Sequence, residues 1–367
     1  MLLKSLHSWW ILPLLMVFPC AHGQTLDQPR ASDGSDQGTL SLYFENDLFT
    51  ETDQNYTNGI RLSLVSPDLD SFQQRFIDND ALQVVFDQLN PRLNAFHDWL
   101  FDLQDYGETR SRRIVLSFGQ MIYTPETIDA RQLLADERPY AGWLYMGVAY
   151  HLRTKDSHAL DQLETLGVNL GIVGPWALGQ EAQDLIHDVR GFDKFQGWGN
   201  QLKNEPGFQL IYENKRKLLK QHNGNGFEYD VIGHYGASLG NIAVYANGGA
   251  EFRAGWNIPD DFGTSAVRPG GDNSAPDTPG IPDWGFHLFV STDARLVAHD
   301  IFLDGNTFSN SHSVSKEYLV ADAAIGFSLS FDELKLSFAR IHRTKEFKKQ
   351  QGAHNYGSLS LSWNFNL

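Results

Sequence analysis

The chain has 367 residues, 33 glycines, one cysteine and a formal net charge of −16. This length allows one large domain or two medium ones, and the acidic balance argues against nucleic acid as a partner. No stretch beyond the first residues approaches the ~18 uncharged apolar residues that a transmembrane helix needs.

The chain begins with a segment typical of a secretory signal peptide. Residues 1–23 combine a basic start, a short apolar run and a small-x-small exit, which predicts cleavage before Gln24. A lipoprotein signal at Cys20 is the alternative, but the bulky residues before it disfavour that interpretation. Because Cys20 is the only cysteine, the mature chain 24–367 has no disulfides, and we expect hydrogen-bond closure and burial to stabilise it.

The stretch "LYFENDLFTETDQNYTNGIRLSLV" (42–65) begins and ends with the alternation of a β-strand and has a polar centre. That centre contains Asn46, Asp47, Asp53, Asn55, Tyr56, Thr57, Asn58 and Gly59. Such residues are favoured in turns, so an ordinary loop is one interpretation and a cation site is another. The acidic residue that ends an EF-hand loop is missing.

Residues 67–110 interrupt the alternation. Their pattern predicts one or two amphipathic helices, broken at Pro91. We therefore expect a helical insertion between two strands.

A second polar cluster lies in "GIVGPWALGQEAQDLIHDVRGFDKFQGWGNQLKNEPG" (171–207). Residues 180–189 fit a short helix. Gln180, Gln183 and His187 are spaced i, i+3 and i+7, so they share one face. A surface helix with glutamine and histidine on its wet face is common, and taken alone the pattern favours that interpretation.

The final stretch "GSLSLSWNFNL" (357–367) alternates large apolar residues with small polar ones. About a dozen runs of this kind occur, an even number as in closed bacterial barrels. They span 39–46, 58–66, 112–121, 143–153, 163–173, 207–215, 227–238, 241–254, 284–298, 317–331, 333–343 and 356–367.

The pattern predicts an all-β fold, a closed antiparallel transmembrane β-barrel of about 12 strands with short helices in its loops. A secreted β-sandwich is the alternative. Residues 257–283, rich in Pro, Gly and Asp, are expected to form a flexible loop. Aromatic residues such as Trp143, Tyr145, Trp256 and Trp284 are expected to anchor the barrel at the membrane interfaces.

In such a barrel the two polar clusters share one rim, because the first strand ends at Asn46-Asp47 and the fifth at Val173. Asp and Asn side chains can hold Ca²⁺, which polarises an ester carbonyl. A neutral histidine can deprotonate water. Cation-assisted ester hydrolysis is therefore available to this rim.

The motifs "FENDLF…YTNG", "Q-x-IYTP", "DERPYAGW" and "GIVGP…GQEAQDLIH…W…Q" together closely resemble the outer-membrane lipid A 3′-O-deacylase family. The resemblance covers nearly the whole mature chain in the same order. It implies a twelve-stranded barrel, multi-pass in the outer membrane, with a Ca²⁺-dependent site near the outer leaflet. The substrate would be lipid A or lipopolysaccharide, which loses its 3′-linked acyloxyacyl chain. We expect a monomer surrounded by outer-membrane lipids.

The resemblance also implies roles for single residues. His187 corresponds to the general base, with Asn46 and Gln183 as further catalytic residues. Asp47 and Thr57 correspond to residues in the cation-binding part of the site.

Two positions depart from the family pattern. Asp193 replaces a glutamate and is expected to serve the cation. The family lysine after the "IYSP"-like turn is missing; Arg131 and Arg138 can replace it by charge, and an arginine fork suits a substrate phosphate.

Two other functions remain open. A passive porin or a lipopolysaccharide-binding barrel would need only the alternation. A serine phospholipase would need a serine beside a histidine, but residues 180–204 contain no serine, so water is favoured as the nucleophile.

Overall fold

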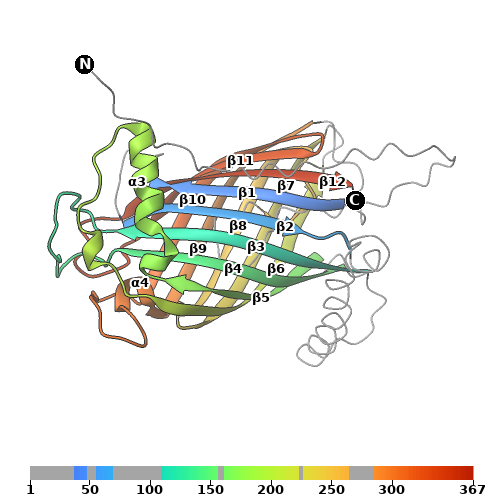
Figure 1. The fold of residues 1–367 in the computed structure, drawn as a ribbon. Coiled ribbons are helices and arrows are strands. Elements are labelled where there is room, and N and C mark those ends of the chain that lie inside the picture. Colours follow the sequence, from blue (N-terminus) through green and yellow to red (C-terminus); the bar gives the residue numbers. More distant parts are fainter. Residues whose placement is uncertain are drawn as a thin grey trace, which may run out of the picture. The chain divides into compact units, whose positions relative to one another are not determined.

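The computed structural model describes residues 37–47, 55–68, 109–155, 161–222, 226–263 and 284–366 (Figure 1). The predicted signal peptide, nearly all of the predicted insertion 67–110 and residues 264–283 lie outside the described residues.

The described residues form a closed barrel in which each strand pairs with antiparallel neighbours and β1 pairs with β12. This confirms the predicted twelve-stranded architecture. The strands are β1 (Gln37–Asn46), β2 (Asn55–Val65), β3 (Thr109–Thr124), β4 (Ala141–Lys155), β5 (Asp161–Val173), β6 (Glu205–His222), β7 (Phe227–Gly240), β8 (Ala243–Trp256), β9 (Trp284–Asp300), β10 (Leu319–Phe331), β11 (Leu334–Arg343) and β12 (His354–Asn366).

Short helices lie between some of these strands. They are η3 (Pro175–Ala177), α3 (Gly179–Arg190), η4 (Trp198–Asn200) and α4 (Ile301–Asp304). None of the helices in the described ranges has the length and apolar character needed to cross a bilayer.

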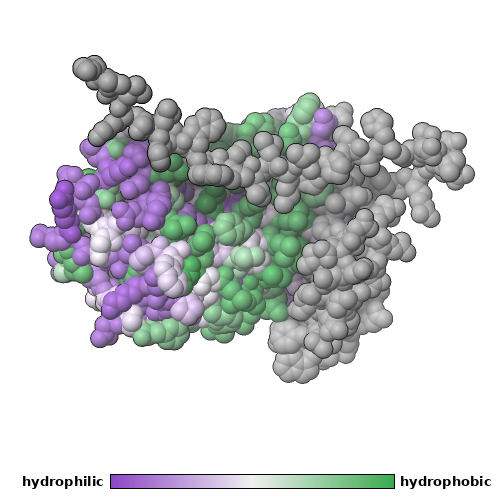
Figure 2. All heavy atoms as spheres, in the orientation of Figure 1, coloured by the Kyte–Doolittle hydropathy of each residue, from purple (hydrophilic) through white to green (hydrophobic). Residues whose placement is uncertain are grey.

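Alternation along the strands separates an apolar outer face from a polar lumen. Leu42, Phe118 and Met146 are exposed on the outer face. Figure 2 shows hydrophobic side chains gathered over the strands and hydrophilic ones toward the end that carries α3. Inside, hydrogen bonds link neighbouring strands, including Ser41 Oγ to Ser362 Oγ at 2.9 Å.

The aromatic residues divide between the two faces. Trp256 and Trp284 are exposed where β8 ends and β9 begins, as interfacial anchors would be. Trp143 and Tyr145 are buried instead and stack on each other with ring centroids 4.4 Å apart. Their prediction as anchors is wrong because alternation along β4 turns them into the lumen.

The barrel has two rims. We call the rim where β1 begins and β12 ends the terminal rim, and the opposite one, with α3 and α4, the helix rim. Toward the helix rim the lumen contains a cavity of about 100 Å³ with Glu45, Asp293, Arg295 and Arg343 among its lining residues.

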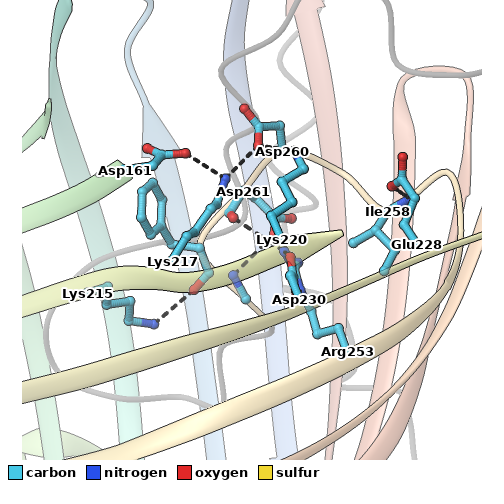
Figure 3. A network of polar contacts seen from close by, with 12 residues as sticks. Asp161, Lys215, Lys217, Lys220, Glu228, Asp230, Arg253, Ile258, Asp260 and Asp261 are labelled. Atoms are coloured by element: carbon cyan, nitrogen blue, oxygen red, sulfur yellow. Dashed lines mark hydrogen bonds and ion pairs between the residues drawn. The ribbon is translucent and has the colours of Figure 1, made fainter. Parts of the chain in front are cut away.

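At the terminal rim, residues 257–263 after β8 fold into the lumen (Figure 3). Asp260 accepts hydrogen bonds from Lys217 Nζ at 2.6 Å and Arg153 Nη2 at 2.8 Å. Both cations also lie over the ring of Phe262, at 4.8 and 5.0 Å from its centroid. This part of the expected flexible loop 257–283 is therefore packed and ion-paired, because lumen cations match its charges.

The neighbouring carboxylate reaches another wall. Asp261 is fully buried and pairs with Arg253 on β8 and Lys335 on β11. β11 and β4, which carries Arg153, are separated by four strands in one direction and six in the other. The segment therefore spans the lumen and is anchored to nearly opposite walls.

Candidate functional site

A row of cross-strand partners marks the outer face of the wall at the helix rim. Asn46 on β1 pairs with Asn58 on β2, Asn58 with Ile122 on β3, and Ile122 with Gly142 on β4. Alternation places Asn46 outside, because its neighbour Glu45 lines the lumen cavity. All four residues of the row are nevertheless buried, so something covers them.

The cover begins with the start of α3 on β4. A Cβ added to Gly142 would lie 3.2 Å from the Cα of Gly179, which is tighter than most such contacts, so a side chain there would push the start of α3 away from the wall. Gln120, on the outer face of β3, donates through Nε2 to the carbonyl oxygens of Ala177 at 2.6 Å and Leu178 at 3.2 Å. The residues that lead into α3 are thereby fixed to the wall.

The next contact lies on β3. Ile122 forms a buried cluster with Tyr140, Phe195 and Trp198, and Ala182 of α3 packs against that cluster. Burial raises the pKa of Tyr140 to about 12, so its phenol stays neutral.

These two contacts give the direction of the helix. Between Gly179 near β4 and Ala182 near β3 the axis advances about 4.5 Å, close to the spacing of about 4.8 Å between strands. His187 lies about 12 Å beyond Gly179 along the same axis. The axis of α3 therefore runs from β4 over β3 toward β2 and β1, and Figure 1 shows α3 lying across these strands.

Helix α3 turns its polar face inward. Gln183 and His187 are each only 2% exposed. Leu185 and Val189 are 55% and 77% exposed on the outside. Gln180, predicted on the polar face, is exposed. An ordinary surface helix would show the opposite arrangement. The amphipathicity of α3 therefore suits a helix that lies between a polar site and lipid.

The ring of His187 is oriented by the loop that follows α3. Its Nδ1 lies 2.6 Å from the backbone oxygen of Asp193. A carbonyl only accepts, so Nδ1 carries the proton and Nε2 is the basic nitrogen of the neutral ring. Phe195 and Phe192 pack edge-on against the ring, with centroids 5.7 and 6.0 Å away.

Asp193 contributes to this geometry through its backbone. Its side chain is exposed, whereas its carbonyl oxygen holds His187. Gly191 makes the reversal possible, since it ends α3 with a φ of 71°.

Several buried amide groups point to a ligand. Both amide atoms of Gln183 and the amide oxygen of Asn58 are buried without a hydrogen-bond partner among the described residues. Most buried polar groups are paired, so these orphaned atoms are what a site for a bound group would leave. Asn46 and Asp47 are also buried and supply further oxygen donors.

This donor set fits a hard cation such as Ca²⁺, which binds carboxylate and amide oxygens. Within the described ranges, no three His, Cys, Asp or Glu side chains cluster as metal ligands, so amides would complete the set. The register shift between Tyr56 and Asn58 forms a bulge at Thr57. The side chain of Thr57 lies outside the described residues.

The two arginines lie away from this row. Arg138 is buried over the ring of Tyr123, 4.5 Å from its centroid, and its Nη1 pairs with Glu346 at 3.1 Å. Burial alone would raise the pKa of Glu346, but Arg138 and Arg343 outweigh it and hold that pKa low. Arg131 is exposed, and its carbonyl accepts a hydrogen bond from Asn200.

The sequence interpretation gave no role to Asn58, Gln120 or Gly142. All three lie inside the quoted motifs "YTNG", "Q-x-IYTP" and "DERPYAGW". Their presence in those motifs could have marked them as site residues. Their contacts could not be predicted, because these depend on pairing between strands.

Comparisons with known proteins identify the family and the fold. The family model described as outer membrane protein LpxR matches residues 10–365. LpxR from Salmonella typhimurium has a similar structure, with a TM-score of 0.66 and 17% identity, covering 89% of this chain and 99% of its own. The β domain of the Bordetella autotransporter BrkA has a TM-score of 0.42 and 6% identity, covering 90% and 100%. No curated protein matches the chain.

Proposed function

Because the chain belongs to the LpxR family of outer-membrane proteins, we propose that it is a lipid A 3′-O-deacylase. It hydrolyses the ester of the 3′-linked acyloxyacyl chain of lipid A at the outer leaflet. The observation that carries this proposal is the buried Gln183–His187 face of α3 on the outer wall. A substrate whose acyl chains lie in the bilayer reaches the outer wall, not the lumen.

His187 is the general base. Nε2 takes a proton from water while the water oxygen attacks the ester carbonyl, and the imidazolium then gives that proton to the departing alcohol oxygen. The hydrogen bond from Nδ1 to the Asp193 carbonyl keeps the ring in the required tautomer. Gln183 offers amide donors to the water or to the developing oxyanion.

Asn46, Asp47 and Thr57 would hold Ca²⁺, which when bound supplies positive charge to the ester carbonyl. Asp193 acts on His187 through its backbone. Of the two predicted phosphate ligands, the exposed Arg131 is the candidate for a substrate phosphate, whereas Arg138 is buried over Tyr123 and paired with Glu346.

The test is mass spectrometry of lipid A from cells that produce the protein. His187→Ala should abolish the loss of the 3′-linked chain while the barrel remains heat-modifiable on gels. His342→Ala, which removes an exposed histidine near the same rim, should keep full activity. An active His187→Ala variant would remove this mechanism.

The cation is tested separately with purified protein. EGTA should stop deacylation and added Ca²⁺ should restore it. Activity that is indifferent to both would refute the cation role but leave the deacylase proposal standing.

The same spectra separate the alternatives. A passive porin leaves the number of acyl chains on lipid A unchanged, and the segment 257–263 that spans the lumen disfavours a wide pore. A serine phospholipase would release fatty acid from glycerophospholipids and would be blocked by a serine-directed reagent.

A further inference from the structure

We propose that Asn58 is a direct ligand of the cation through its amide oxygen. This inference rests on the proposed function and extends it, because Asn58 is not among the residues to which the family motif gives a role.

The position of Asn58 is set by the sheet. It is the cross-strand partner of Asn46, so their side chains lie on the same outer face at neighbouring positions. Asp47 directly follows Asn46. The bulge at Thr57 breaks the regular pairing with β3 immediately before Asn58, and bulges commonly direct side chains at functional sites.

The environment of Asn58 makes its amide oxygen informative, because that oxygen has no hydrogen-bond partner among the described residues. The residue is only 6% exposed, although it lies on the lipid-facing side of a barrel wall. Below it on the same face, Ile60 and Leu62 are apolar and exposed. A polar side chain at such a position is retained only where a partner compensates its burial.

The chemistry of the missing partner follows from the atom that lacks one. The amide oxygen is an acceptor, so it binds a cation or a donor. The buried carboxylate of Asp47 brings a negative charge to the same end of β1 and β2, which favours a cation. A neutral amide oxygen is an ordinary Ca²⁺ ligand and adds coordination without adding charge repulsion.

The experiment is isothermal titration of Ca²⁺ into the full mature chain in detergent, after treatment with chelator. Asn58→Ala should weaken Ca²⁺ binding at least tenfold. Asn58→Asp replaces the neutral oxygen with a charged one and should bind Ca²⁺ at least as tightly as the wild type. Asn364→Ala removes a buried asparagine that is paired with Thr39 at 2.7 Å on the far rim, and it should leave the affinity unchanged.

Unchanged affinity in folded Asn58→Ala would overturn the proposal, as would a wild-type chain that takes up no Ca²⁺. If Asn58→Ala does not fold, Asn58→Asp decides: affinity at least equal to the wild type supports a ligand role, and weakened binding overturns it. Deacylation by the wild type is measured in parallel. If the wild type cleaves lipid A without binding Ca²⁺, the proposed function stands and only the ligand role of Asn58 is refuted.

Discussion

Replacing Asp261 with alanine should destabilise the barrel strongly. The carboxylate is fully buried and pairs with Arg253 and Lys335. Arg253 keeps Asp230, 2.5 Å away, but among the described residues Lys335 keeps no other carboxylate. Breaking a buried pair by removing one partner costs about 3–5 kcal/mol, because a buried charge is left uncompensated.

The assay is urea unfolding of the full chain in micelles, followed by tryptophan fluorescence. Asp136→Ala is the matched control, since Asp136 pairs with Lys349 where both side chains are about two-thirds exposed. Exposed pairs contribute about 0–1 kcal/mol. If Asp261→Ala loses no more free energy of unfolding than Asp136→Ala, the buried ion pairs of segment 257–263 do not stabilise the barrel.

Three further predictions follow from the same contacts. Lumen cations hold the pKa values of Asp260 and Asp261 below the ordinary 3.8 despite burial. The two carboxylates therefore stabilise the fold fully above pH 3.8, and this stabilisation declines as the pH falls toward their folded-state pKa values. The urea midpoint of unfolding should drop in acid, and it should drop less in Asp260→Asn. Gln120→Ala removes two hydrogen bonds of about 1 kcal/mol each that anchor the start of α3, and it should lower kcat for lipid A while the unfolding of the barrel changes little. Gly142→Val should displace α3 and abolish deacylation, whereas Gly199→Ala, with nothing within 4 Å of the added atom, should be fully active; equal activity of the two would contradict the close contact between wall and helix.

The barrel could be predicted because apolar and polar residues alternate along its strands. In β12, Ser360 and Ser362 face inward and Leu361 and Trp363 face outward, as a period of two requires. The helix 180–189 was recognisable for a similar reason, and the structure extends it by only one residue at each end. These features depend on neighbours in the sequence.

The contacts of the site could not be read in this way. That Asn46 and Asn58 are partners follows from pairing between strands, and the burial of Gln183 follows from which face of α3 meets the wall. Composition likewise described 257–283 as a loop without showing that Asp260 meets cations on other strands. Arg138 has the charge expected for a phosphate, but it lies over Tyr123 beside Glu346.

The outward apolar side of α3 has a kinetic consequence for the proposed reaction. In that reaction the exposed Leu185 and Val189 would face the acyl chains, and the path to His187 would run sideways through the leaflet. The rate of deacylation should then depend on the mole fraction of lipid A in the membrane or micelle around the barrel. Adding a detergent that is not a substrate should slow the reaction even when the bulk concentration of lipid A stays constant.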